Sequence, residues 1–138
     1  MIQMRNVSVA LLLAALAMNP LGQAMAAANA AKMVTGMKTE AAPVATLTGM
    51  IGTWTPADLT SLDKAASVKV FDTRTIYDSA DLLKVSSAET AKAAELGKFH
   101  DAIRGDAALK GWFDTNKIDV NKVVAVSMPN GTPELFLY

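Results

Sequence analysis

The chain has 138 residues, with 13 basic and 13 acidic side chains and no cysteine. Without cysteine there can be no disulfide, no thiolate metal centre and no cysteine-linked lipid anchor. The charges balance and no stretch concentrates Lys and Arg, which argues against nucleic acid or an anionic membrane as a partner.

The first 26 residues have the order of a secretory signal peptide. A positive charge at Arg5 precedes an apolar run over residues 7–18, and small side chains follow. The run is well short of the roughly 20 residues that a helix needs to cross a bilayer. Small side chains at Ala24 and Ala26 predict cleavage after Ala26, and residues 28–30 offer a second site. We therefore expect an exported protein, periplasmic or secreted, with no stable membrane anchor after cleavage.

Residues 27–52 are rich in Ala, Thr, Gly and Met and have no sustained apolar period. Pro43 interrupts them. This composition predicts a flexible leader, so the folded part is expected to be one small domain over residues 53–138.

A helix is expected to begin at Pro56. Thr55 can cap its N-terminus, proline is favoured at the first helical position, and Asp58 places an acid in the first turn. The helix should end near residue 64. The next run, Ser67–Asp72, alternates apolar and polar side chains in part and predicts the first strand.

The central part of the chain is expected to be helical. Asp78 and Asp81 favour a helix start, and the run Ser86–Glu89 resembles a capping box at which the helix restarts. Over residues 86–104 the apolar side chains recur at steps of three and four residues, which predicts one amphipathic helix. Asp106 can cap a further short helix.

Two apolar strands are expected near the end of the chain, within residues 120–128 and 135–138. The Asn130-Gly131 pair between them favours the positive φ angles of a tight hairpin turn. Both strands are apolar at consecutive positions, so both faces of the sheet must be covered. The predicted fold is α/β, a small three-stranded mixed sheet packed against helices, with strand 67–72 parallel to strand 120–128.

Asp72 and Arg74 follow the first strand, where α/β enzymes often place a nucleophile or a metal ligand. The run 71–75 resembles the start of the haloacid dehalogenase-like phosphatases, a hydrophobic strand followed by Asp-x-Asp-x-Thr. Arg74 stands where that pattern has its second Asp, and we infer no membership from so short a run. His100, the only histidine, could act as a general base if it lay beside Asp72. Asp72, Arg74 and His100 are therefore the candidates for catalytic residues.

Oxygen ligands at Asp72, Asp78 and Asp81 could together hold a hard cation such as calcium or magnesium. The alternative is structural: Asp78 and Asp81 cap a helix, while Asp72 pairs with Arg74 or accepts hydrogen bonds from turn amides. One histidine and no cysteine exclude a multi-histidine or thiolate zinc site. No cofactor is expected.

Three large side chains, Trp54, Phe136 and Tyr138, are candidates for an interface. Few helices are available to cover both faces of the hairpin, so the favoured function is a non-catalytic exported domain. It would bind a second copy of itself, another envelope protein or a small ligand. A homodimer is one form that this binding could take. Two alternatives stay open: a small hydrolase or metal-dependent enzyme that uses Asp72, and a structural or stress-related envelope protein.

Overall fold

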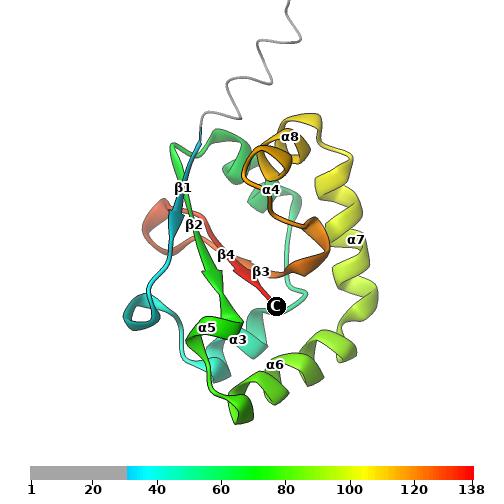
Figure 1. Cartoon of the computed structure of the whole chain (residues 1–138). Coiled ribbons are helices and arrows are strands. Elements are labelled where there is room, and N and C mark those ends of the chain that lie inside the picture. The colour runs from blue at the N-terminus through cyan, green and yellow to red at the C-terminus, as the bar shows by residue number, and fades with distance from the viewer. Residues whose placement is uncertain (1–30) are drawn as a thin grey trace, which may run out of the picture.

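A four-stranded mixed sheet lies at the centre of this computed structural model, which describes residues 31–138 (Figure 1). The strands follow the order β1-β2-β4-β3. Their bounds are β1 (Lys32–Thr35), β2 (Ser67–Asp72), β3 (Val123–Ser127) and β4 (Glu134–Leu137). β1, β2 and β4 run parallel, and β3 is antiparallel to β4. The carboxyl ends of three strands therefore lie at the same end of the sheet.

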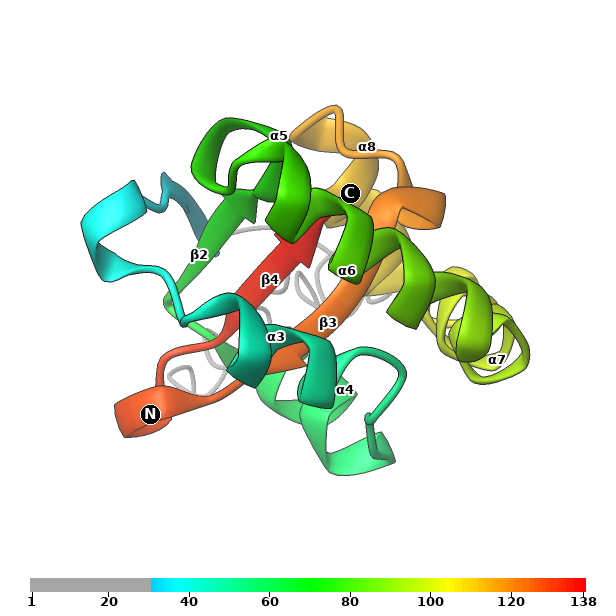
Figure 2. The ribbon, with the colours of Figure 1, turned by 90° about the horizontal axis from the view of Figure 1, so that it is seen from below.

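Six α-helices surround the sheet in the described residues. They are α3 (Val44–Met50), α4 (Pro56–Lys64), α5 (Thr73–Ile76), α6 (Ser79–Ala91), α7 (Ala93–Arg104) and α8 (Ala107–Thr115), and the 3-10 turns are η1 (Lys38–Glu40), η2 (Val120–Lys122) and η3 (Pro129–Gly131). Figure 1 shows the strands between α4 and α8 on one side and α3 and α6 on the other, and Figure 2 shows α3 and α6 in front of the sheet. No helix in this part of the chain combines the length and the apolar character needed to cross a membrane.

The core is built around phenylalanine rings from the sheet and the helices. Phe71 in β2 and Phe136 in β4 are fully buried and stack with their ring centroids 5.0 Å apart. Phe99 in α7 and Phe113 in α8 are also fully buried. Residues 123–126 of β3 are all buried. Elements of the same chain therefore cover both faces of the hairpin.

The α/β class and several local predictions are confirmed. The helix α4 begins at Pro56, and Thr55 and Asp58 form a capping box in which each side chain accepts a hydrogen bond from the backbone N–H of the other residue. The strand 67–72 and the terminal hairpin are both present. Asn130 and Gly131 have φ angles of +54° and +81°, as the turn sequence predicts.

The structure differs from the prediction of a flexible leader over residues 27–52. Residues 32–35 form β1, a fourth strand that the predicted sheet lacked, and Leu47 and Ile51 are fully buried. The run is short and mixes polar with apolar residues, so it becomes a strand only because β2 offers a partner along its edge. Residues 27–30, like the predicted signal peptide, lie outside the described residues.

The predicted neighbour of β2 was wrong. β2 pairs in parallel with β4, and β3 lies at the edge of the sheet. Pairing with β4 places Val70 beside Leu135 and Phe71 beside Phe136. The stacked phenylalanine rings and the matched aliphatic pair explain this choice, because side chains on neighbouring strands stabilise a sheet through such contacts.

The single amphipathic helix predicted for residues 86–104 is two helices, α6 and α7, separated at Lys92. Asp78 caps α6, so the helix begins there and Ser86 lies inside it. Lys92 has φ −111° and ψ 21°, which breaks the helical path. The change of direction allows Val85 from α6 and Leu96 from α7 both to reach the core.

The backbone at Gly36 packs directly on the ring of Phe71, where a Cβ at position 36 would overlap the ring atoms. Gly36→Ala should therefore lower the free energy of unfolding by about 1–3 kcal/mol, the usual effect of overpacking a core. Gly49→Ala is the matched control, because a Cβ there meets no atom within 4 Å and α3 should gain helix propensity. Denaturant unfolding measures both variants. Equal effects at the two positions would contradict the close approach.

Candidate ligand-binding site

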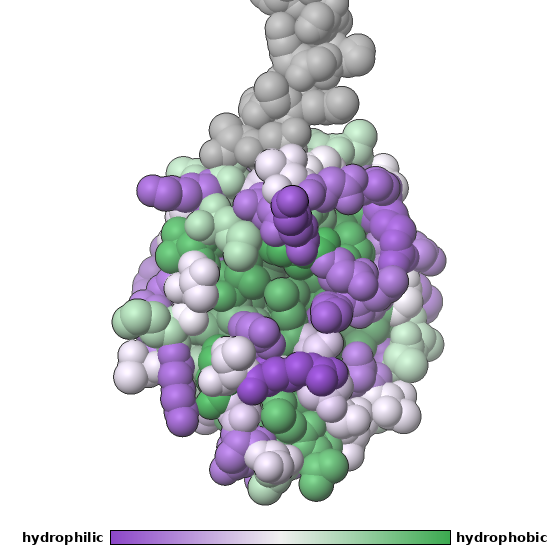
Figure 3. All heavy atoms as spheres, viewed as in Figure 1, coloured by the Kyte–Doolittle hydropathy of each residue, from purple (hydrophilic) through white to green (hydrophobic). Residues whose placement is uncertain are grey.

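A pocket of about 360 Å³ lies at the carboxyl ends of the parallel strands. Thr35 ends β1, Asp72 ends β2 and Leu137 ends β4, and residues 116–119, which follow α8, form the opposite wall. Ligands of open α/β sheets bind outside the carboxyl ends of the strands. Figure 3 shows apolar surface in the middle of one face of the molecule, with hydrophilic side chains around it.

The turn after β2 sets the positions of Asp72 and Arg74. The Thr73 side chain between them is fully buried, and its hydroxyl donates a hydrogen bond to the carbonyl oxygen of Leu137 at 2.7 Å. The Asp72 Oδ1 atom accepts a hydrogen bond from the backbone N–H of Arg74 at 3.0 Å and caps α5. The buried threonine therefore ties the ends of β2 and β4 together and leaves Asp72 and Arg74 exposed at the pocket.

Arg74 and Tyr138 form one side of the pocket together. The guanidinium carbon of Arg74 lies 4.7 Å from the centroid of the Tyr138 ring, within cation–π range. The backbone N–H of Tyr138 donates to the carbonyl oxygen of Lys122 at 2.8 Å. Because Lys122 also lines the pocket, this contact brings a second cationic residue to the same side.

The opposite wall is a turn that begins where α8 ends. Lys117 has a φ of +57°, a left-handed conformation that is uncommon outside glycine. The backbone N–H of Ile118 donates to the carbonyl oxygen of Phe113 at 2.9 Å, and the Asn116 side chain donates to that of Trp112 at 2.9 Å. Ile118 is buried while Lys117 is exposed. The turn therefore gives the pocket both an apolar and a cationic side chain.

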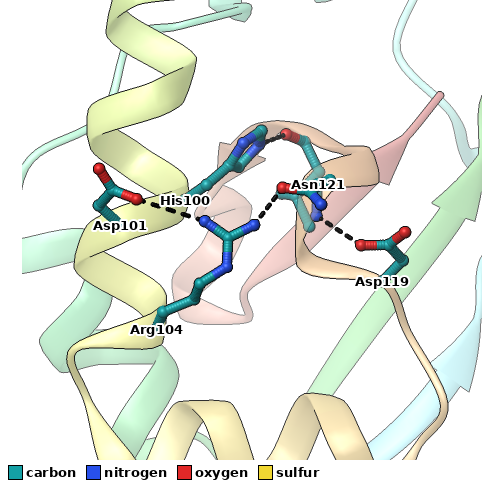
Figure 4. Close-up of polar contacts among 6 residues, drawn as sticks. His100, Asp101, Arg104, Asp119 and Asn121 are labelled. Carbon is teal, nitrogen blue, oxygen red and sulfur yellow. Dashed lines mark hydrogen bonds and ion pairs between the residues drawn. The ribbon is translucent and has the colours of Figure 1, made fainter.

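A polar network joins α7 to the end of this wall (Figure 4). The Arg104 guanidinium donates to Asp101 at 3.3 Å and to the side-chain oxygen of Asn121. The backbone N–H of Asn121 donates to Asp119 Oδ1 at 2.9 Å. Asp119 caps η2 and also lines the pocket, so the network fixes this wall against α7.

His100 lies outside the pocket, which corrects the predicted combination of Asp72, Arg74 and His100. Its Nε2 atom is 2.7 Å from the carbonyl oxygen of Val123 (Figure 4). The half-buried ring therefore links α7 to β3. The structure brings Asp72 and Arg74 to one pocket and does not bring His100 to them.

The three acids considered as metal ligands are also not brought together. Asp78 caps α6, and its Oδ1 atom accepts a hydrogen bond from the backbone N–H of Asp81 at 2.8 Å. Asp72 caps α5 instead. Within residues 31–138 no group of three or more His, Cys, Asp or Glu side chains could hold a metal ion. The structural alternative is confirmed for Asp78, which caps a helix, and for Asp72, which accepts a hydrogen bond from the turn amide of Arg74. Asp81 is not a cap, because it supplies the backbone N–H that Asp78 accepts.

The three interface candidates have different environments. Phe136 is fully buried in the core, so it cannot contact a partner in this fold. Trp54 is half-buried and stacks on Phe99 with 5.4 Å between ring centroids. Tyr138 is half-buried and lies under Arg74. The cleavage residues Ala24 and Ala26 lie outside the described residues.

Sequence reasoning missed Lys117, Ile118, Asp119 and Lys122 as lining residues of the pocket. Their segment reads as a turn between a helix and a strand, and nothing in that pattern indicates which strand ends it will face. The one available signal is that this charged turn lies between a helix and a buried strand, a position in which loops often carry binding residues.

Comparisons of this chain with family models, with curated proteins and with solved structures gave no match. The function is therefore argued from the geometry of the site.

Proposed function

We propose that this chain is an exported binding domain that takes a small ligand into the pocket at the carboxyl ends of β1, β2 and β4. The pocket itself carries the proposal. Its volume of about 360 Å³ falls within the roughly 300–1,000 Å³ of small-molecule sites. Val70, Ile118 and Leu137 contribute apolar surface and charged side chains surround them, an arrangement suited to a ligand with both characters. The order of residues 1–26 supports export.

The pocket favours a small ligand over a partner subunit as the main object of binding. A partner was expected because both faces of the hairpin needed cover, and the helices of the same chain bury both β3 and β4. Self-association stays a prediction, but the need to cover the hairpin no longer supports it. An enzyme that uses Asp72 has less support, because His100 does not share the pocket.

A fragment screen by two-dimensional ¹H–¹⁵N NMR tests the proposal. The full chain is expressed in a bacterium and recovered from the periplasmic fraction, and its mass also reports whether residues 1–26 have been removed. Fragments in equal numbers of anions, cations and neutral compounds are then added. We expect some to shift the amide signals of residues 35–36, 72–75 and 116–122, with dissociation constants of about 0.1–1 mM, typical for compounds of that size.

Thr35→Tyr should abolish these shifts, because position 35 lines the pocket and a larger side chain would fill it. Val34→Tyr is the matched control, since consecutive residues of a strand point to opposite faces and Val34 does not line the pocket. Shifts that scatter over the surface, that survive Thr35→Tyr, or that are absent for every fragment contradict the proposal.

A further inference from the structure

The positively charged side chains that line the pocket form no ion pairs with its carboxylates. Arg74, Lys117 and Lys122 line it together with Asp72 and Asp119. None of these three cations lies within ion-pair distance of a carboxylate in the described residues. Among its lining side chains the pocket therefore has three positive charges that form no ion pair and two negative ones.

The two carboxylates already have structural partners. Asp72 Oδ1 accepts the backbone N–H of Arg74, and Asp119 Oδ1 accepts that of Asn121, at 3.0 and 2.9 Å. Each carboxylate thereby caps a helical turn. The three cations have no such structural role, because the side chains of Arg74, Lys117 and Lys122 make no hydrogen bond among residues 31–138. Most of the hydrogen-bonding groups that the pocket offers to a ligand are therefore N–H donors on positively charged side chains.

Arg74 is the best placed of these donors. Its guanidinium lies over the Tyr138 ring, which restricts the long side chain while leaving the planar N–H groups free. A guanidinium can donate two parallel hydrogen bonds to one carboxylate. Val70 and Leu137 line the same pocket and offer apolar surface, which the body of an organic anion can cover and an inorganic anion cannot.

We infer that the ligand is a small organic carboxylate, held by Arg74 with support from Lys122, and with its apolar body on Val70, Ile118 and Leu137. This inference rests on the proposed function, because it assigns a ligand class to the same pocket. Lys117 contributes long-range attraction from the opposite wall.

A matched charge series tests the ligand class. Benzoate, benzamide and benzamidine share a planar frame and carry charges of −1, 0 and +1. Each is titrated into the protein at about 150 mM NaCl, which screens attraction beyond roughly 8 Å, and the amide signals of residues 72–75 and 116–122 are followed. We expect benzoate to bind at least about tenfold more tightly than benzamide, and benzamidine to bind least, because a charge-assisted hydrogen bond is worth about that factor.

Arg74→Gln should lower benzoate affinity about tenfold or more and leave benzamide affinity nearly unchanged. Arg74→Lys should retain part of the affinity, since the charge stays and the bidentate geometry is lost. Lys98→Gln is the control, because Lys98 lies on α7 and its side chain pairs with Glu95 away from the pocket. Arg74 is exposed, so a dispersed NMR spectrum is expected for each variant and confirms folding.

The outcomes separate this inference from the proposed function. Benzamide or benzamidine binding the pocket as tightly as benzoate overturns the carboxylate class and leaves the pocket as a binding site. The same holds if none of the three binds while only neutral or cationic fragments of the screen do, or if Arg74→Gln and Lys98→Gln weaken benzoate binding equally. If no compound of the series and no fragment of the screen shifts the amide signals of the pocket, both proposals are overturned.

Discussion

Phe136→Ala should lower the free energy of unfolding by about 3–5 kcal/mol, the range for removing a buried phenylalanine ring. Phe136 is fully buried, lies in β4, one of the two inner strands, and stacks on Phe71 with ring centroids 5.0 Å apart. Removal of the ring leaves a cavity beside Phe71 in the core. Denaturant unfolding measures the loss, and light scattering coupled to size-exclusion chromatography reports the oligomeric state of the same sample.

Two further variants keep this prediction testable if the alanine variant does not fold. Phe136→Leu retains much of the side-chain volume and should lower the stability by only about 1–1.5 kcal/mol. Trp54→Ala removes a half-buried ring and should lower it less than Phe136→Ala. A change of oligomeric state in Phe136→Ala with little loss of stability would instead support the original assignment of Phe136 to an interface.

Asp63→Asn should make the protein more stable at and above pH 7 and have little effect near pH 4. Asp63 in α4 faces Asp106, the N-cap of α8 whose carboxylate accepts two backbone N–H groups. The Oδ1 atom of Asp63 is buried, and no donor group within residues 31–138 gives it a hydrogen bond. Burial, together with a hydrogen bond to Asp106 and charge repulsion from it, raises the pKa of Asp63 from its ordinary value of 3.8 to about 7.

The raised pKa fixes the sign of the pH dependence. Between pH 4 and 7 the folded protein holds a proton on Asp63 that the unfolded chain has released, so the free energy of unfolding falls as the pH rises through this range. An asparagine does not titrate and can donate to Asp106 at every pH. The gain above pH 7 should be about 1–2 kcal/mol, well below the full shift because the side chain is partly in contact with water.

Thermal unfolding of Asp63→Asn and of the unchanged protein between pH 4 and 8 measures this difference. Asp114→Asn is the control, because it removes a charge at a largely exposed position of α8, the helix that Asp106 caps. Its effect should stay within about 0.5 kcal/mol and vary little with pH. A constant difference between Asp63→Asn and the unchanged protein over this range would contradict the carboxyl pair.

Local chemistry was readable from the sequence where it involves residues a few positions apart. Thr55, Pro56 and Asp58 indicate the start of α4 because the cap, the proline and the acid act within one turn. Asp106 and the Asn130-Gly131 pair act over similarly short distances. The helix-cap interpretation of Asp78 follows from the same short-range chemistry.

The parts that sequence reasoning missed depend on partners far along the chain. Residues 32–35 become a strand because β2 lies beside them, and the Trp112 indole N–H donates to the carbonyl oxygen of Ala31 at 2.8 Å, 81 positions away. Likewise, the position of β4 beside β2 depends on the Phe71–Phe136 stack. A short, mixed run carries too little local preference to predict such pairing.

The sequence by itself determined the α/β class, the starts of α4, α6 and α8 and the closing hairpin, because capping and turn geometry act within a few residues. It also placed Asp72 and Arg74 at the end of a strand. Only the tertiary structure decided that these residues share a pocket with Lys122 and Tyr138 and that His100 does not. The physical reason is the order of the strands. Pairing of β2 with β4 brings the two chain segments together, and the hydrogen bond from the buried Thr73 hydroxyl to Leu137 holds them there.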